Sequence, residues 1–339
     1  MSLVEQLEAL VATGVPGVVA VTPSDEAAAG VADLGTGESM TPRHRFRIGS
    51  VTKTLVATVV LQLVDEGELG LDEEAAPLVE RITIRQLLNH TSGLPEFYDN
   101  FFELFEPYRQ DPTYQWPVGE HDLLEQVLAK PRLFPPGEGW SYSNSNYLLL
   151  GLLLEEATQS PLRDELRHRI FEPVDLTATD YVPAASAAGL ARGYLPPENP
   201  FLPREGGSVD VTDLALPLAG AAGGVVSTAR DVARTLGAVL GGELLAPHLR
   251  AELLDAVGSD WDESDRYGLG IEEVSSVMGG ERSPCGAAWG HLGLGLGYTT
   301  IALASEDGRR QVVICMNGFF PSDEAWELLG RLVWSSYCT

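Results

Sequence analysis

The sequence predicts an α/β fold in which an antiparallel sheet is flanked by helices and interrupted by an all-helical insertion. Strand patterns occur near both ends of the chain, whereas the stretch between them carries helical patterns separated by long Pro- and Gly-rich loops. The composition is that of a globular protein, with 44% hydrophobic and 21% charged residues. At 339 residues the chain is long enough for two domains, or for one domain with a large insertion.

The first part of the chain predicts the opening helices and strands of this fold. Two segments have the apolar spacing of a helix, and three have the composition of strands. The helices are expected at 4–11 and 51–66, and the strands at 17–21, 30–35 and 45–48. A polar turn at 23–25 joins the first two strands, and Gly67 ends the second helix.

The rest of the chain predicts the insertion and then the return of the sheet. Helices are expected at 84–89, 121–129, 146–158 and 162–171, and strands at 267–274, 287–290, 298–305 and 311–317. Asp307-Gly308 is typical of a hairpin turn between the last two strands, and 322–336 of a closing amphipathic helix. We therefore expect residues 1–70 and 223–339 to form the sheet domain and residues 71–222 a mostly helical insertion. The functional site is expected in the cleft between them.

The charge of the chain argues against two classes of partner. Its formal net charge is -27 and its pI about 4.4, so we expect neither nucleic-acid nor membrane-surface binding. No apolar run reaches the roughly 18–20 residues of a membrane span, and the longest, Leu148 to Leu154, ends at Glu155. The histidines lack the His-Glu-x-x-His spacing of zinc sites. The glycines after His291 lack the spacing of a dinucleotide loop. Neither a metal nor a cofactor is expected.

A serine and a lysine one helical turn apart form the first candidate site. The chain has only two lysines, and one of them, Lys53, lies three residues after Ser50, so that its Nζ can reach the serine Oγ. Ser50 is expected at or next to a helix N-cap, where the helix terminus adds partial positive charge. A serine needs a base to act as a nucleophile, and a lysine serves only if burial or other cations lower its pKa. A capping serine followed by a surface lysine is the alternative.

Two further motifs contain groups that catalysis can use. Tyr142–Asn144 (Tyr-Ser-Asn) lies at a loop–helix junction, where the hydroxyl can point into a cleft and the amide can hold a lysine or a substrate carbonyl. The alternative is an ordinary loop with an Asn cap. His291–Gly293 (His-Leu-Gly) lies in a strand whose glycines let the backbone approach a ligand. The alternative is an ordinary strand histidine.

Together, these motifs resemble the serine β-lactamase/DD-peptidase superfamily. The resemblance is close to class C β-lactamases and to the secreted D-alanyl-D-alanine carboxypeptidases of actinomycetes. The order and spacing of Ser-x-x-Lys, Tyr-Ser-Asn and His-x-Gly carry it over nearly the whole chain. The matching stretches are 46–53, 61–67, 90–94, 142–144 and 267–270. The fold implied is the β-lactamase/transpeptidase type.

The resemblance also implies an acyl-enzyme mechanism. Ser50 would be the nucleophile, and Lys53 and Tyr142 would share the proton transfers. Asn144 would orient Lys53 and the substrate amide. His291 would replace the lysine of the more common Lys-Thr-Gly motif.

The same strand carries the rest of the implied site, with two departures from the family. The backbone N–H groups of Ser50 and Leu294 would form the oxyanion hole. The family grips the free carboxylate of its substrate with hydroxyls in His-Thr-Gly-Thr, but this chain has Leu292 and Leu294 on either side of Gly293. It also has Glu272 near the place of a carboxylate-binding arginine, and a glutamate would repel that carboxylate. We therefore expect an amide, ester or acyl-carrier substrate without a free carboxylate.

Three functions remain open at this stage. The leading prediction is a serine hydrolase or acyltransferase acting on a small-molecule or peptide amide or ester. The second is a D-alanyl-D-alanine carboxypeptidase proper, in which a loop arginine such as Arg204 or Arg282 restores the carboxylate grip. The third is a β-lactam-binding or sensor protein that is acylated without turnover. β-Lactams are candidate ligands in each case, and a monomer is expected.

The cysteines bear on the cellular compartment. The chain has three, of which Cys315 lies in a buried-strand pattern and is expected as a free core residue. Cys285 and Cys338 lie in more polar surroundings, and the residues alone leave their pairing open. The resemblance implies that these two form a disulfide. A secreted or cell-envelope protein is then expected, with its leader absent from this chain, and a cytoplasmic location is the alternative.

Overall fold

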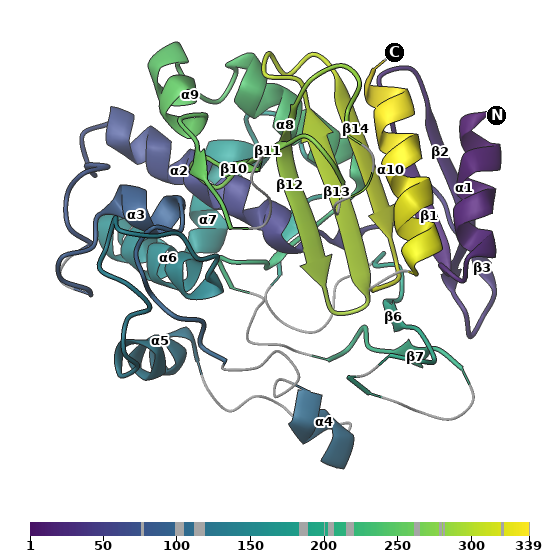
Figure 1. Cartoon of the computed structure of the whole chain (residues 1–339), viewed down its shortest axis with the longest axis horizontal. Coiled ribbons are helices and arrows are strands. Elements are labelled where there is room, and N and C mark those ends of the chain that lie inside the picture. Colours follow the sequence, from purple (N-terminus) through teal and green to yellow (C-terminus); the bar gives the residue numbers. More distant parts are fainter. Residues whose placement is uncertain are drawn as a thin grey trace.

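A nine-stranded antiparallel sheet is the largest element of the computed structural model (Figure 1). The residues described are 1–75, 78–98, 105–111, 119–182, 189–199, 201–202, 207–214, 220–260, 265–277, 280, 282–319 and 322–338. The strand order is β3-β2-β1-β14-β13-β12-β11-β10-β9. The strands are β1 Gly17–Val21, β2 Glu26–Asp33, β3 Glu38–Ser39, β9 Val257–Gly258, β10 Arg266–Tyr267, β11 Glu272–Val274, β12 Ala288–Gly295, β13 Tyr298–Ala304 and β14 Gln311–Met316. Strands from the two ends of the sequence therefore meet where β1 pairs with β14.

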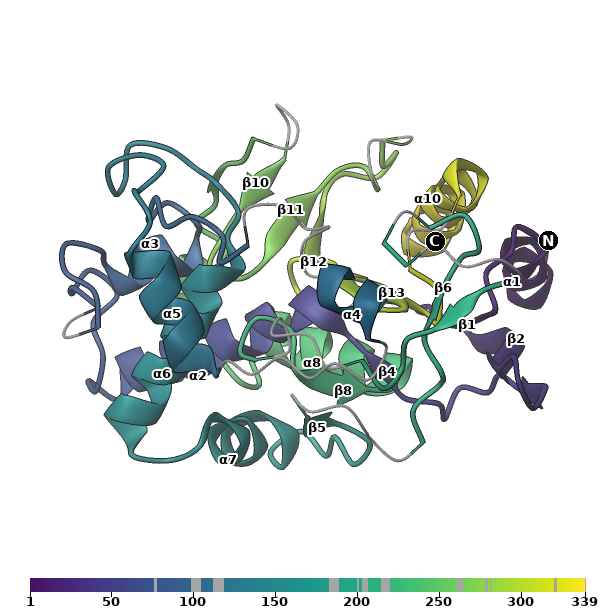
Figure 2. The same ribbon diagram turned by 90° about the horizontal axis from the view of Figure 1, so that it is seen from below.

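Helices cover both faces of this sheet. The helices α1 (Leu3–Ala12) and α10 (Asp323–Tyr337) pack on one face, and α8 (Ala229–Gly241) packs on the other (Figures 1 and 2). All seven residues of β13 are buried, as expected of a central strand covered on both sides. Each fully buried Val, Leu or Ile side chain contributes about 1.5–3 kcal/mol, so these two apolar layers hold the sheet together.

The remaining helices lie beside the sheet and around α6. They are α2 Thr52–Asp65, α3 Ile84–Leu88, α4 Glu106–Gln110, α5 Glu120–Leu128, α6 Asn144–Thr158, α7 Leu162–Leu166 with a π-helical turn Arg167–Phe171, and α9 Pro247–Leu253. Residues 144–154 of α6 are all buried, because α2, α3, α5 and α7 surround this apolar helix. Short strands complete the fold: β4 Phe46–Arg47, β5 Asp180–Tyr181 and β8 Val225–Ser227 form one sheet, and β6 Tyr194–Leu195 and β7 Val209–Asp210 form another.

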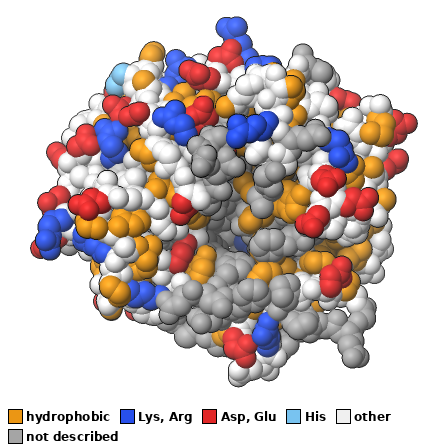
Figure 3. Space-filling model, viewed as in Figure 1, with side chains coloured by type: hydrophobic (Ala, Val, Ile, Leu, Met, Phe, Trp, Pro, Cys, Tyr) orange, Lys and Arg blue, Asp and Glu red, His pale blue; other side chains and the backbone are white. Residues whose placement is uncertain are grey.

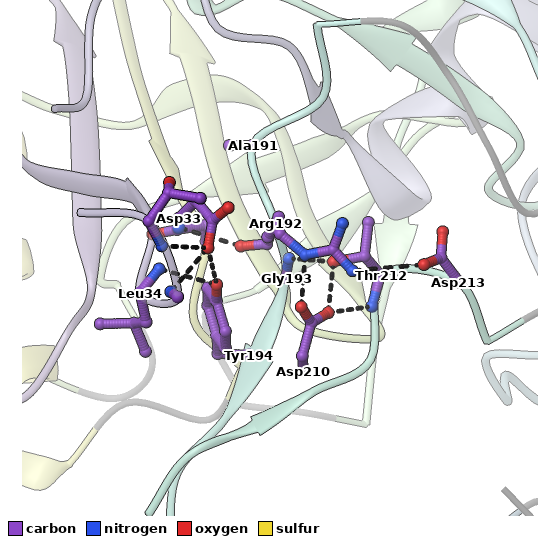
Figure 4. Close-up of polar contacts among 12 residues, drawn as sticks. Asp33, Leu34, Ala191, Arg192, Gly193, Tyr194, Asp210, Thr212 and Asp213 are labelled. Atoms are coloured by element: carbon purple, nitrogen blue, oxygen red, sulfur yellow. Dashed lines mark hydrogen bonds and ion pairs between the residues drawn. The ribbon is translucent and has the colours of Figure 1, made fainter. Parts of the chain in front are cut away.

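A polar cluster connects the β6–β7 pair with the main sheet (Figure 4). The Tyr194 hydroxyl accepts a hydrogen bond of 2.8 Å from the backbone N–H of Leu34, just after β2. Arg192 forms ion pairs with Asp210 and, at 3.2 Å, with Asp213. Because these charges are partly exposed, each pair adds at most about 1 kcal/mol. The cluster serves mainly to set the path of the chain beneath the sheet.

The predicted α/β fold with an antiparallel sheet and flanking helices is confirmed, and several predicted boundaries are wrong. Residues 71–222 are not all helical, because they contain β5, β6 and β7. The single strand expected at 267–274 is broken at Gly270, whose φ of 73° lies in the left-handed region. A Cβ there would lie 2.7 Å from Cβ of Ala57 in α2, so only glycine lets the chain approach that helix. The strand expected at 287–290 continues to Gly295. The division into a sheet domain and an insertion remains a prediction.

Candidate active site

The predicted nucleophile, Ser50, lies in a tight turn pressed against β12. Gly49–Val51 form a 3₁₀ turn that leads directly into α2, so Ser50 lies next to Val51, the N-cap of that helix. Gly49 has a φ of 53°, and a Cβ there would lie 2.7 Å from the carbonyl oxygen of Leu294 in β12. Gly293 is equally confined, since its Cβ would lie 2.0 Å from the Ile48 carbonyl oxygen. Two glycines thus allow the serine turn and the strand to touch along their backbones.

Lys53 is fully buried in the first turn of α2, and its Nζ has three oxygen partners. Nζ lies 3.1 Å from Ser50 Oγ, 2.7 Å from Asn144 Oδ1 and 2.8 Å from the carbonyl oxygen of Ala222. Burial lowers the pKa of Lys53 to about 7, although the carboxylates of Glu96 and Glu272 oppose this shift. About half of the amine is therefore neutral near pH 7. A neutral amine that donates to two of these oxygens can direct its lone pair at the third.

Tyr142 supplies the second group on the serine. Its hydroxyl donates a hydrogen bond of 2.9 Å to Ser50 Oγ. Burial raises the pKa of Tyr142 well above its usual value, so the phenol is neutral at physiological pH. Asn144 is the first residue of α6 and Tyr142 lies two residues before it, and both contact groups of Ser50 and Lys53. Figure 3 shows that the surface is hollowed near the centre of the face viewed in Figure 1.

A stretch of chain between α3 and α4 holds the Tyr142–Asn144 segment from behind. His90 Nδ1 accepts hydrogen bonds from the Ser143 backbone N–H (3.3 Å) and from Asn146 Nδ2 (2.9 Å). Ser92 Oγ donates to Asn146 Oδ1 at 2.6 Å. The family-like stretch at 90–94 therefore has a structural role that the sequence did not reveal.

Two groups that contact Asn144 and Lys53 were not predicted. Glu96 accepts hydrogen bonds from Asn144, and the Ala222 carbonyl accepts one from Lys53. Glu96 follows the 90–94 stretch by two residues, and this proximity to a family-like motif is the one sequence feature that could have pointed to it. A backbone carbonyl such as that of Ala222 has no signature in sequence.

His291 lies in a hydrogen-bonded chain with Tyr267 and Glu272. Its Nδ1 faces two acceptors, Glu272 Oε1 at 2.9 Å and the Leu292 carbonyl oxygen at 2.8 Å. Nδ1 therefore carries a proton, and in the neutral ring Nε2 accepts from the Tyr267 hydroxyl at 2.9 Å. The rings of His291 and Tyr142 are 6.3 Å apart. Tyr267 was quoted only as part of a motif and was not predicted as a site residue.

Comparison with known proteins decides the family. The chain matches the Beta-lactamase family over residues 3–333. It belongs to the Beta-lactamase family. The resemblance predicted from the sequence is thereby confirmed.

Solved structures similar to this Beta-lactamase family member include amidohydrolases. A D-stereospecific amidohydrolase from Streptomyces sp. has 30% identity and a TM-score of 0.82, with 98% of this chain and 97% of the other covered. A D-amino acid amidase from Ochrobactrum anthropi SV3, solved with L-phenylalanine amide, has 28% identity and a TM-score of 0.81, covering 97% and 96%. A D-aminopeptidase of Brucella anthropi is 33% identical over 170 residues, 49% of this chain and 32% of the relative. The chain spans between 32% and 54% of the length of three curated relatives that it matches.

The residues that depart from the family pattern lie in β11 and β12. Glu272, which was predicted near the place of a carboxylate-binding arginine, is buried, and its carboxylate faces His291. Leu292 packs against the apolar layer beneath α1 and α10, whereas Leu294 packs against the larger core, and both are partly exposed. Residues two apart on a strand point to the same side, so strand alternation does not explain this difference. The sequence pattern alone did not show which apolar cluster each leucine meets.

The other predicted groups of this Beta-lactamase family member are placed as follows. Cys285 and Cys338 form a disulfide with a Cα–Cα distance of 5.7 Å, and Cys315 is a buried free thiol. Arg282 lies in a short bridge with Ser276. The predicted alternative Arg204 lies outside the described residues.

Within the described ranges, no cluster of three His, Cys, Asp or Glu side chains is placed to hold a metal. No helix in the described part of the chain has both the length and the hydrophobicity of a membrane span.

Proposed function

We propose that this protein is a serine acyl-enzyme hydrolase that cleaves amides and esters, with Ser50 as nucleophile. The observation that carries the proposal is the convergence on Ser50 Oγ of a buried amine at 3.1 Å and a neutral phenol at 2.9 Å. One group is suited to accept the serine proton, and the other to protonate the leaving group.

In acylation, neutral Lys53 takes the Ser50 proton as Oγ bonds to the substrate carbonyl carbon. The bond to the leaving nitrogen or oxygen then breaks, and the leaving atom takes the proton of the Tyr142 hydroxyl. The Lys53 ammonium then gives a proton to the Tyr142 oxygen, so both groups return to their starting states. Three hydrogen bonds stabilise the Lys53 ammonium, because its N–H groups face the oxygens of Asn144, Ala222 and Ser50. In deacylation, water attacks the ester and the proton transfers run in reverse, which releases the acid and restores the serine.

We assign the oxyanion hole to the backbone N–H groups of Ser50 and Leu294. Support comes from the close packing at Gly49 and Gly293, which brings the β12 backbone against the serine turn. Two such donors, preorganised where charge develops, contribute about 3–4 kcal/mol each to catalysis.

We further propose that the substrates are amides or esters of D-amino acids with a free amino group and no free carboxylate on the leaving side. The structural neighbours named as D-stereospecific amidohydrolase and D-amino acid amidase support this class. The net charge of -27 also supports it, because such a surface attracts a cationic amide and repels a peptide carboxylate.

The deciding experiment combines active-site labelling with a substrate panel. Intact-mass and peptide analysis after a fluorophosphonate should show one adduct, on Ser50, and none in Ser50→Ala. The exposed-site variant Ser39→Ala is the matched control and should label normally. Labelling at another serine, or full activity in Ser50→Ala, would end the proposal.

The panel compares kcat/KM for a D-amino acid amide, its L-enantiomer, a p-nitrophenyl ester and a peptide ending in D-Ala-D-Ala. We expect the D-amide and the ester to be preferred over the peptide acid. Preference for the free acid would identify a carboxypeptidase instead. A stable benzylpenicillin adduct with no turnover of any substrate would identify a β-lactam-binding protein.

We also propose that the protein is exported and monomeric. The Cys285–Cys338 disulfide supports export, because disulfides persist in oxidising compartments. Size-exclusion chromatography with light scattering tests the monomer, and a species of twice the mass would refute it.

A further inference from the structure

Glu96 lies directly behind the Asn144 side chain. Its Oε1 accepts two hydrogen bonds from this one residue, from the backbone N–H at 2.7 Å and from Nδ2 at 2.8 Å. The backbone bond satisfies an N–H at the start of α6, where Ser143 contributes no side-chain cap. A carboxylate at this helix terminus is also favoured by the helix dipole. Glu96 therefore satisfies and stabilises the N-terminus of α6, although it lies 48 residues earlier in the chain.

The same contact decides which way the Asn144 amide points. Because Nδ2 donates to Glu96, Oδ1 faces the opposite direction and accepts from Lys53 Nζ at 2.7 Å. A flipped amide would set its oxygen against the carboxylate and its NH₂ against the amine. Two hydrogen bonds would thus be replaced by two unfavourable contacts. Glu96 selects the single orientation in which Asn144 can hold Lys53.

The backbone that carries Glu96 is itself held in place. Lys130, the other lysine of the chain, donates from Nζ to the carbonyl oxygens of Glu96 and Phe97, each at 3.2 Å. A continuous path of contacts therefore runs from Glu96 through Asn144 and Lys53 to Ser50 Oγ. Only the last of these groups has to touch a substrate.

We propose that Glu96 is a positioning residue of the acyl-enzyme reaction, which holds the Asn144 amide so that Lys53 stays aimed at Ser50. The inference rests on the proposed function. In its charged form Glu96, whose own pKa is raised by burial, also raises the pKa of Lys53. The other titratable groups that face Lys53 are Glu272, His90 and the phenols of Tyr142 and Tyr147.

Rates of Ser50 labelling by a fluorophosphonate, measured against pH, test this role. Glu96→Ala removes both hydrogen bonds, and we expect an acylation rate about 100-fold lower with little change in reagent affinity. Glu96→Gln keeps a carbonyl oxygen for Asn144, and we expect it to retain the rate within about tenfold. In Glu96→Gln the acid side of the rate–pH profile should move to lower pH, because the charge that raises the pKa of Lys53 is gone. Glu125→Gln, an exposed carboxylate on α5, is the control and should change neither quantity.

The outcomes separate this inference from the proposed function. Wild-type protein that is not labelled at Ser50 contradicts the function. Normal labelling of wild-type and of folded Glu96→Ala, with the same pH profile, contradicts the role of Glu96 alone. If Glu96→Ala does not fold, Glu96→Asp replaces it, because its shorter side chain withdraws the carboxylate from Asn144. A wild-type rate in Glu96→Asp would then overturn the inference.

Discussion

The burial of Lys53 predicts how acylation of Ser50 depends on pH. Its pKa of about 7, against 10.5 for an exposed lysine, leaves about half of the amine neutral at pH 7. At an ordinary pKa only about one amine in 3,000 would be neutral there. The difference corresponds to about 5 kcal/mol by which the buried site disfavours the ammonium. Because the neutral form is the base in the proposed mechanism, acylation should rise with pH and level off above about pH 8.

The assay is the first-order rate of fluorophosphonate labelling between pH 5.5 and 8.5, since the reagent carries no titrating group. Below the midpoint we expect the rate to fall about tenfold per pH unit. Lys53→Arg keeps a cation of similar reach that cannot lose its proton, and it should lower the rate by about 100-fold to 10,000-fold. A rate independent of pH in this range, or a midpoint above pH 9, would refute the assignment of Lys53 as the base.

Three further predictions concern packing, the disulfide and charge. Gly293→Ala should destabilise the fold by about 1–3 kcal/mol and slow acylation, because its Cβ would meet the Ile48 carbonyl oxygen at 2.0 Å. Gly295→Ala has nothing within 4 Å and should be neutral, so equal urea midpoints for the two variants would contradict the packing argument. The unreduced, denatured protein should show one free thiol, and three free thiols would exclude the Cys285–Cys338 bond. These cysteines are 53 residues apart, so reduction of the bond should lower the free energy of unfolding by about 4 kcal/mol. Added salt should lower kcat/KM for a cationic amide more than for a neutral ester, and equal responses would count against electrostatic attraction.

Local patterns predicted the parts of the site that depend on spacing along the chain. Ser50 and Lys53 are one helical turn apart, so their contact follows from helix geometry once the helix is recognised. Tyr142 and Asn144 stood out as a motif at a loop–helix junction, but only the resemblance assigned them to the site of Ser50, because no local rule places them against α2. Glu96 was missed because its function depends on an amide 48 residues later in the chain.

The errors in the fold have similar physical causes. The helix α8 was not predicted although its signals are present: the Thr228 side chain caps it at Asp231, and Val232, Leu236 and Val239 form a buried face. These signals lie within 223–339, the part of the chain that was assigned to the sheet domain. The pairing of Glu272 with His291 depends on strand register, which places Glu272 opposite Gly290 and which composition does not reveal.

The pairing of β1 with β14 has a consequence for how the chain folds during synthesis. The β1–β2 ribbon is translated before its neighbour β14, with most of this chain between them, and a two-stranded ribbon alone is marginally stable. Long-range pairing of this kind is slow and leaves a strand edge open to aggregation in the meantime. Lys53, Tyr142 and Asn144 are also translated well before β12 arrives to complete the serine turn. A nascent chain therefore holds the side chains of the proposed site before the strand that completes it, and we expect no activity until β12 has paired with the rest of the sheet.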